Sequence, residues 1–147
     1  MHWFLTGVIA SLIYGVCAVS FKYLLSEKYL GASPTWALIG MGIGWSVIGL
    51  VGARIWQTAA HQTTLSALGW GIPVGLLNGI ATLMIMRALS NPLTNVSQLV
   101  PIYNTNTLVA FVLGILLFKE LPMGPDLYRN LAGALLIVVG SVLIGMK

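Results

Sequence analysis

Apolar residues run along this chain in five long stretches, each bounded by short polar or turn-forming segments. A helix needs about 20 apolar residues to cross the hydrocarbon core of a bilayer, and each stretch has about that length. None of them shows the ten-residue alternation of a membrane barrel strand. The pattern therefore predicts five membrane-spanning helices, at residues 3–25, 35–53, 67–89, 93–118 and 127–146.

The segments between the predicted helices are short and rich in residues that end helices and form turns. Short links make consecutive helices antiparallel neighbours, and they leave no room for a separate soluble domain. We therefore expect a single domain over residues 1–147, an all-α membrane protein folded as a compact bundle of five helices. The links are SEKYLGASP, RIWQTAAHQTT, SNP and KELPMGPDLYRN, in chain order.

Composition supports the same class of protein. Hydrophobic residues make up 58% of the chain and charged residues 7%, and the mean hydropathy is +0.94. A soluble domain covers itself with roughly a quarter charged residues. The formal net charge of +4 comes from basic residues that stand singly between apolar runs, which favours anchoring at the membrane edge over binding to nucleic acid. We expect the chain to have the lipid bilayer as its partner and no nucleic acid.

Neither catalytic nor metal-binding chemistry is indicated. The acidic residues Glu27, Glu120 and Asp126 all lie at helix ends or in connections. The two histidines are outside the predicted helices, and the single cysteine lies within the first one. Nothing in this set approximates a nucleophile–base pair or a metal-ligand cluster. We expect a protein with no enzymatic activity, cofactor or metal.

Polar side chains inside the predicted helices are the candidate functional residues, because polar and charged groups are costly in lipid. Lys22 lies about one turn from the end of the first helix and shares a face with Tyr14. Asn78 and Thr82 share a face of the third helix. The two faces predict walls of one cavity. For Lys22, the alternative is a side chain that reaches to the lipid headgroups.

The fourth predicted helix contains the unusual stretch LVPIYNTNTLVAFVLG. Pro101 and Asn104 fall on one face with Gln98 at its margin, whereas Asn106 points almost the opposite way. Both amides can line one cavity only if Pro101 distorts the helix. Otherwise Asn104 faces the solute and Asn106 contacts a neighbouring helix. The candidate substrate-binding residues are Tyr14, Lys22, Asn78, Thr82, Gln98, Pro101, Asn104 and Asn106.

Basic residues are spread almost evenly over the two sides of the predicted bundle. A chain whose basic residues do not favour one side of the membrane can insert in either orientation, so two copies can pair antiparallel. Small residues spaced by four along three of the helices permit close packing within one chain, or a dimer through the last helix. The basic residues of the two sides are Arg54, Lys119 and Arg129, and Lys28, Arg87 and Lys147.

Several segments of the chain occur in a characteristic order. The first helix ends in YGVCAVSFKYLL, and MRALSNPLTNVSQLVPIY, FVLGILLFKELP and NLAGALLIVVGSVLIG follow in the second half. This order resembles one EamA repeat of the drug/metabolite transporter superfamily, and the similarity covers nearly the whole chain. Lys22 matches a lysine that many members carry at the end of the first helix. The matching positions of the second half are Ala88, Leu89, Pro101, Glu120, Gly133 and Gly140.

The resemblance implies a multi-pass transporter of the cytoplasmic (inner) membrane for a small metabolite or drug-like solute. Most members join two repeats of opposite orientation and work by alternating access. A single repeat then implies a homodimer, possibly antiparallel. The first helix lacks the acidic residue of the small multidrug resistance transporters, which favours neutral or anionic solutes over proton-coupled export of cations.

Two alternatives to a solute transporter stay open. One is a flippase subunit for a polyprenyl-phosphate-linked sugar, in which Lys22 would meet a phosphate. The other is an accessory membrane subunit that transports nothing and whose polar residues only hold helices together.

Overall fold

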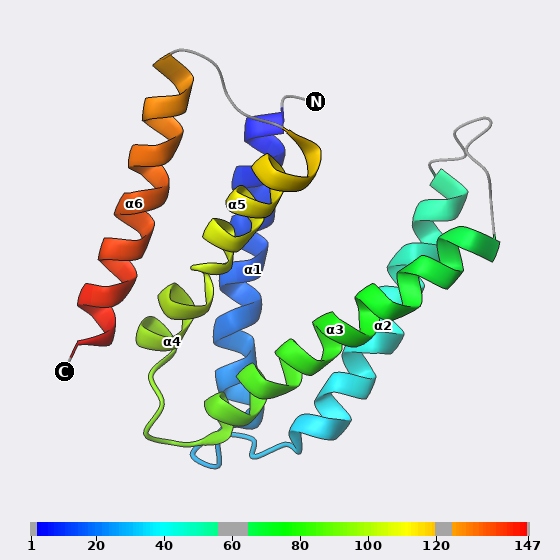
Figure 1. Ribbon diagram of the computed structural model, residues 1–147. Coiled ribbons are helices and arrows are strands. Elements are labelled where there is room, and N and C mark those ends of the chain that lie inside the picture. Colours follow the sequence, from blue (N-terminus) through cyan, green and yellow to red (C-terminus); the bar gives the residue numbers. More distant parts are fainter. Residues whose placement is uncertain (1–2, 56–64, 120–124, 147) are drawn as a thin grey trace. The chain divides into compact units, whose positions relative to one another are not determined.

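Helices make up all the regular structure in the residues that this computed structural model describes, 3–55, 65–119 and 125–146 (Figure 1). Five stretches of these residues are long and apolar enough to cross a membrane, and one of them comprises two helices. The prediction of an all-helical protein with five membrane-spanning helices is confirmed to this extent, and it indicates a multi-pass membrane protein. The helices are α1 (Trp3–Leu25), α2 (Pro34–Ile55), α3 (Leu65–Ser90), α4 (Val96–Tyr103), α5 (Asn106–Phe118) and α6 (Pro125–Gly145).

The prediction of the fourth helix, at residues 93–118, is wrong in two respects. The predicted bounds of the other four helices agree with the structure within two residues. The fourth helix begins later, at Val96, because the side-chain Oδ1 of Asn91 accepts the Leu93 N–H at 2.9 Å and holds the chain in a turn around Pro92. Its α-helical hydrogen bonding is also interrupted at Asn104 and Thr105, which keep right-handed helical dihedral angles, so α4 and α5 meet at a tighter helical turn.

The chain divides by its internal contacts into two units, Met1–Leu93 and Thr94–Lys147. In the first unit α3 packs against both α1 and α2. The fully buried side chains of this unit gather where α1 ends and where α3 ends, and they are Leu25, Ser26, Met86 and Leu89. The prediction that residues 1–147 form one EamA-like bundle stays a prediction.

The connection from α1 to α2 folds back on the last turn of α1. The N–H groups of Tyr29 and Gly31 donate to Ser26 O at 2.9 and 3.1 Å, and the Ala32 N–H donates to Leu24 O at 2.9 Å. Gly31 has a φ of +62°, a left-handed conformation that glycine adopts without steric cost. These bonds satisfy carbonyls that the helix end would otherwise leave unpaired.

In the second unit α6 packs along α4 and, to a smaller extent, against α5. Ser141 is 7% exposed, and one turn further along α6 a Cβ added at Gly145 would lie 3.6 Å from Cδ1 of Ile102. The small residues of this α6 face therefore pack against α4 of the same chain. Space is open at Gly133 and Gly140, where an added Cβ would meet nothing within 4 Å.

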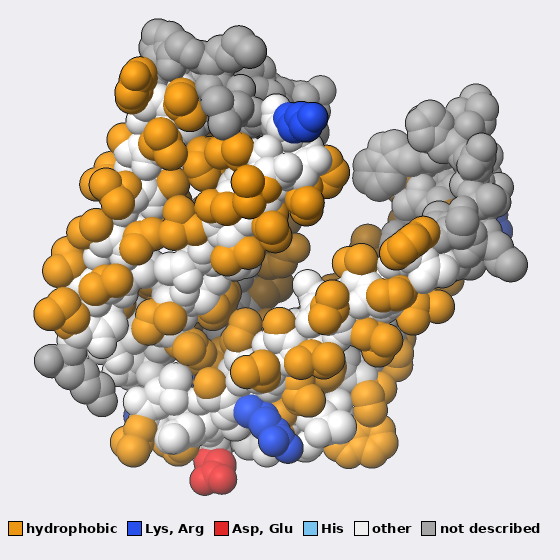
Figure 2. Space-filling view, viewed as in Figure 1, with side chains coloured by type: hydrophobic (Ala, Val, Ile, Leu, Met, Phe, Trp, Pro, Cys, Tyr) orange, Lys and Arg blue, Asp and Glu red, His pale blue; other side chains and the backbone are white. Residues whose placement is uncertain are grey.

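The face of the described helices seen in Figure 2 is mostly hydrophobic and carries few charged side chains. Most large apolar side chains of α1, α2, α3 and α5 are exposed, including Leu12, Ile48, Leu77 and Leu116. A surface of this kind is stable in lipid, which solvates apolar side chains but offers no hydrogen bonds to backbone groups. The exposure is thus the normal condition of a membrane protein.

Met86 and Met84 lie two residues apart on α3, but Met86 is fully buried and Met84 is 68% exposed. We expect Met86→Ala to leave a cavity and to lower the free energy of unfolding by about 2 kcal/mol, the low end for a buried methionine, because lipid already solvates apolar groups. Met84→Ala should change it by less than about 0.5 kcal/mol. Unfolding by titration with SDS measures both. Equal losses would show that the buried cluster does not stabilise the first unit.

Candidate functional site

The interruption between α4 and α5 is a change in backbone hydrogen bonding. Three N–H groups at this junction bond to carbonyls three residues back, where an α-helix would bond four residues back. The donors are Thr105, Thr107 and Leu108, the acceptors are Ile102, Asn104 and Thr105, and the distances are 3.2, 3.2 and 2.9 Å. We refer to residues 101–108 as the α4–α5 junction.

The residue types of the junction explain why the helix stops there. The Thr105 hydroxyl donates to Ile102 O at 2.7 Å, and the Thr107 hydroxyl donates to Asn104 O at 2.9 Å. Hydroxyls bonded in this way compete with the backbone for the carbonyls of a helix. Pro101 also has no backbone N–H, so the preceding turn lacks one of its helical hydrogen bonds. A distortion near Pro101 is therefore present, and it lies three to four residues beyond the proline.

The two amides of the unusual stretch lie on either side of the break, because Asn104 ends α4 and Asn106 begins α5. Both side chains are exposed. Among the described residues, neither side chain has a hydrogen-bond partner, so both amides are available to a ligand or to another helix. Gln98 is half-buried, and its Oε1 accepts from the Asn95 amide at 3.4 Å at the start of α4.

Lys22 connects the end of α1 to the end of α3. Its Nζ donates to Leu89 O at 3.2 Å and to Asn91 O at 2.7 Å. A cation is favourable at the carbonyl end of a helix, where the helix dipole is negative and carbonyls lack N–H partners. Sequence reasoning considered a solute or a headgroup as the partner of Lys22 and missed these carbonyls. The signal was a lysine near one helix end together with SNP at another.

The remaining candidates of the first unit lie apart from Lys22. The Thr82 hydroxyl donates to Asn78 Oδ1 at 3.3 Å, so these two residues of α3 do form one polar group. The Lys22 ammonium, however, sits at Leu89, eleven residues beyond Asn78, which corresponds to about 16 Å along a helix. Tyr14 is 75% exposed on α1. The structure thus brings Asn78 and Thr82 together and does not bring Lys22 to them.

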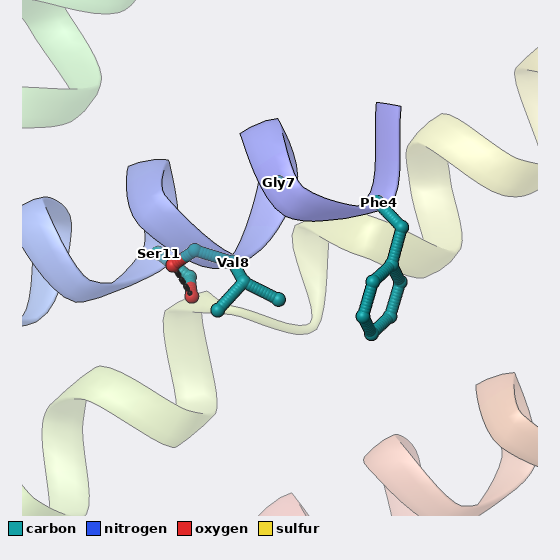
Figure 3. A pocket seen from close by; sticks show the side chains of 4 residues that line it. All are labelled: Phe4, Gly7, Val8 and Ser11. Atoms are coloured by element: carbon teal, nitrogen blue, oxygen red, sulfur yellow. Dashed lines mark hydrogen bonds between the residues drawn. The ribbon is translucent and has the colours of Figure 1, made fainter. Parts of the chain in front are cut away.

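A shallow hollow of about 220 Å³ lies on α1, lined by Phe4, Gly7, Val8 and Ser11 (Figure 3). It forms because Gly7 has no side chain between its larger neighbours. The Ser11 hydroxyl does not point freely into it, since it donates to Val8 O at 2.8 Å. The hollow offers an apolar surface with little polar chemistry.

A second groove, of about 290 Å³, lies between α5 and α6 and was not predicted from the sequence. Its Thr107 end belongs to the α4–α5 junction, while Arg129 and Asn130 belong to the first turns of α6. The sequence feature that could have indicated this groove was the pair of small residues Gly133 and Ala134 in the last span. The lining residues are Thr107, Phe111, Arg129, Asn130, Gly133, Ala134 and Ile137.

We expect Lys22→Gln to lower the free energy of unfolding by about 1.5 to 3 kcal/mol, the range for hydrogen bonds with a charged partner, because two carbonyls lose their donor. The matched control is Lys28→Gln. Lys28 is exposed and lies 6.0 Å from the centre of the Tyr29 ring, so its loss should cost less than about 1 kcal/mol. Titration with SDS in the absence of any solute measures both variants. If the two were equally stable, the bonds of Lys22 would contribute nothing to folding.

Comparison of the chain with models of protein families, with curated proteins and with solved structures gives no match.

Proposed function

We propose that the protein is a membrane transporter or facilitator that moves a small polar solute across the bilayer, and that the solute binds at the α4–α5 junction. The observation that carries the proposal is the interruption of a membrane-spanning helix at Asn104 and Thr105. Transporters commonly bind their substrates where spanning helices are discontinuous, because the unwound segment presents backbone and side-chain polar groups at membrane depth.

The physical argument is one of hydrogen bonding. Backbone groups at membrane depth that lack their α-helical partners are tolerated where protein covers them or where they line a water-filled cavity. Asn104 and Asn106 are exposed beside the interruption, and each amide can both donate and accept. Groups of this kind suit a neutral polar solute, since they supply hydrogen bonds of both senses and no charge.

The proposed assembly is a homodimer of EamA-like subunits in the cytoplasmic membrane. Its support is the resemblance of the chain to one EamA repeat, together with basic residues that are balanced between the two sides. A second copy in the opposite orientation would supply the other half of an inverted pair, which is the arrangement that alternating access uses.

The flippase alternative depends on Lys22 meeting a phosphate. Lys22 donates instead to two backbone carbonyls, so this alternative gains no support from the geometry. Asn78 and Thr82 stay candidates for a second polar contact with the solute, and Tyr14 for an aromatic one. An accessory subunit without transport is the outcome that the following test distinguishes.

The test begins with a thermal-shift screen of the purified protein against amino acids, sugars and nucleosides, followed by flux of each stabilising solute into proteoliposomes. Asn104→Ala should weaken binding of the solute about tenfold, the effect of one lost hydrogen bond, and should leave the melting temperature without solute unchanged. Asn106→Ala is the matched variant across the break. The spacing of a regular helix, which would turn Asn106 away from the solute, is broken at this point, so the Asn106 variant tests whether the solute contacts both amides.

Three outcomes bear on the proposal. Loss of binding in the Asn104 variant alone supports a solute on that face, and loss in both variants supports a solute that spans the break. If no compound of the panel stabilises the protein and the proteoliposomes show no flux, transport fails and the accessory role is favoured. If Asn104→Ala lowers the melting temperature and binding persists, the amide is structural.

A further inference from the structure

Ser141 makes a side-chain hydrogen bond that joins α6 to the α4–α5 junction. Its hydroxyl oxygen lies 2.9 Å from Pro101 O and 2.7 Å from Ile137 O, the carbonyl one turn back in its own helix. A serine hydroxyl has one hydrogen, so the two carbonyls compete for it. Ser141 is also 7% exposed, which means that water does not replace either partner at low cost.

The Pro101 carbonyl is available because the helix ends next to it. In a continuous α-helix its partner would be the N–H of Thr105, four residues on. That N–H donates instead to Ile102 O at 3.2 Å, and the Thr105 hydroxyl donates to the same oxygen at 2.7 Å. The hydroxyl of Ser141 thus takes the place of the donor that the interruption removes.

We propose that Ser141 is a positioning residue that acts as a latch on the fourth span. With its hydrogen on Pro101 O, the hydroxyl supplies the donor that this carbonyl lacks while the span is interrupted, and so lowers the free energy of the interrupted state. With its hydrogen on Ile137 O, the Pro101 carbonyl has no donor unless the Thr105 N–H bonds to it, which favours a continuous span.

The exchange conserves hydrogen bonds at each step, which is why the two states can be close in free energy. The Ser141 hydroxyl keeps one acceptor in both states. The Thr105 N–H moves from Ile102 O to Pro101 O, while the N–H groups of Thr107 and Leu108 move back from three-residue to four-residue bonds. No buried donor or acceptor among these groups loses its partner.

Packing of α6 against α4 brings Ser141 to Pro101 but does not hold the end of α4 in one position. Gly145 lies one turn beyond Ser141 and faces Ile102 with no side chain of its own. At Ser141 and Gly145 the α6 surface next to α4 therefore carries small side chains, which lowers the steric cost of a shift of the end of α4 at these two positions. The latch is a property of these helices, and it is tested without any solute, so it can fail while the transport role stands.

The test is amide hydrogen exchange of the full chain in lipid nanodiscs, followed residue by residue by NMR. In the unaltered protein the amides of Thr105, Thr107 and Leu108 should exchange faster than those of the interior of α5, because bonds over three residues have the poorer geometry. Ser141→Ala should slow these three amides about tenfold, since the freed Pro101 carbonyl draws the span into a continuous helix. Ser141→Thr keeps the hydroxyl and should restore the original rates.

The matched control is Ser46→Ala, because the Ser46 hydroxyl donates at 2.8 Å to Gly42 O of its own helix α2. Thr105→Val removes the competing hydroxyl without changing the size of the side chain, and it should slow exchange in the same direction. It serves as the second variant if Ser141→Ala does not fold.

Faster exchange in Ser141→Ala would mean that the serine only stabilises packing, and exchange equal to that of the control would mean that it does neither. Each of these results overturns the latch.

Discussion

The structure depends on one constraint, which is that lipid offers no partner to a backbone N–H or C=O group. Where a spanning helix stops, the groups that it leaves unpaired need a partner, which the protein has to supply inside the hydrocarbon and which the protein or water supplies at the membrane edge. Two side chains do this at two helix ends. The Lys22 ammonium bonds to carbonyls where α3 ends, and the Ser141 hydroxyl bonds to Pro101 O near the end of α4. Both residues reach these carbonyls from a different helix, so each also ties two helices together.

Such hydrogen bonds between helices matter more here than in a soluble domain. Burying an apolar side chain between helices stabilises their packing less when the surrounding lipid is itself apolar. Among the described residues of the first unit, the fully buried side chains lie at the end where Lys22 bonds. In the second unit the buried Ser141 lies where α6 crosses α4. A few hydrogen bonds therefore tie the helices of each unit together at defined points.

Most of the helical boundaries could be predicted from hydrophobic length and turn residues alone. α1 matches its prediction residue for residue, since an apolar run of the right length has no other stable form in lipid. The fourth span could not be predicted to this degree. Its hydropathy is continuous, and its interruption arises from a proline and two threonine hydroxyls whose bonds to nearby carbonyls are decided by local geometry. The partners of Lys22 were likewise not predicted, because the sequence shows a lysine near one helix end and a turn at another but not that folding brings the two together.

The amino-acid sequence by itself determined that the chain is helical, that it has five segments able to span a membrane, and which few polar residues lie inside them. These follow from the free energy of placing side chains in lipid, which depends on composition and length. Tertiary structure alone decided what those polar residues bond to. Contacts between α1 and α3 turned Lys22 toward a helix end, and contact between α6 and α4 set Ser141 on Pro101. Hydrogen bonds need atoms about 3 Å apart, and only packing brings residues 40 or 67 positions apart to that distance.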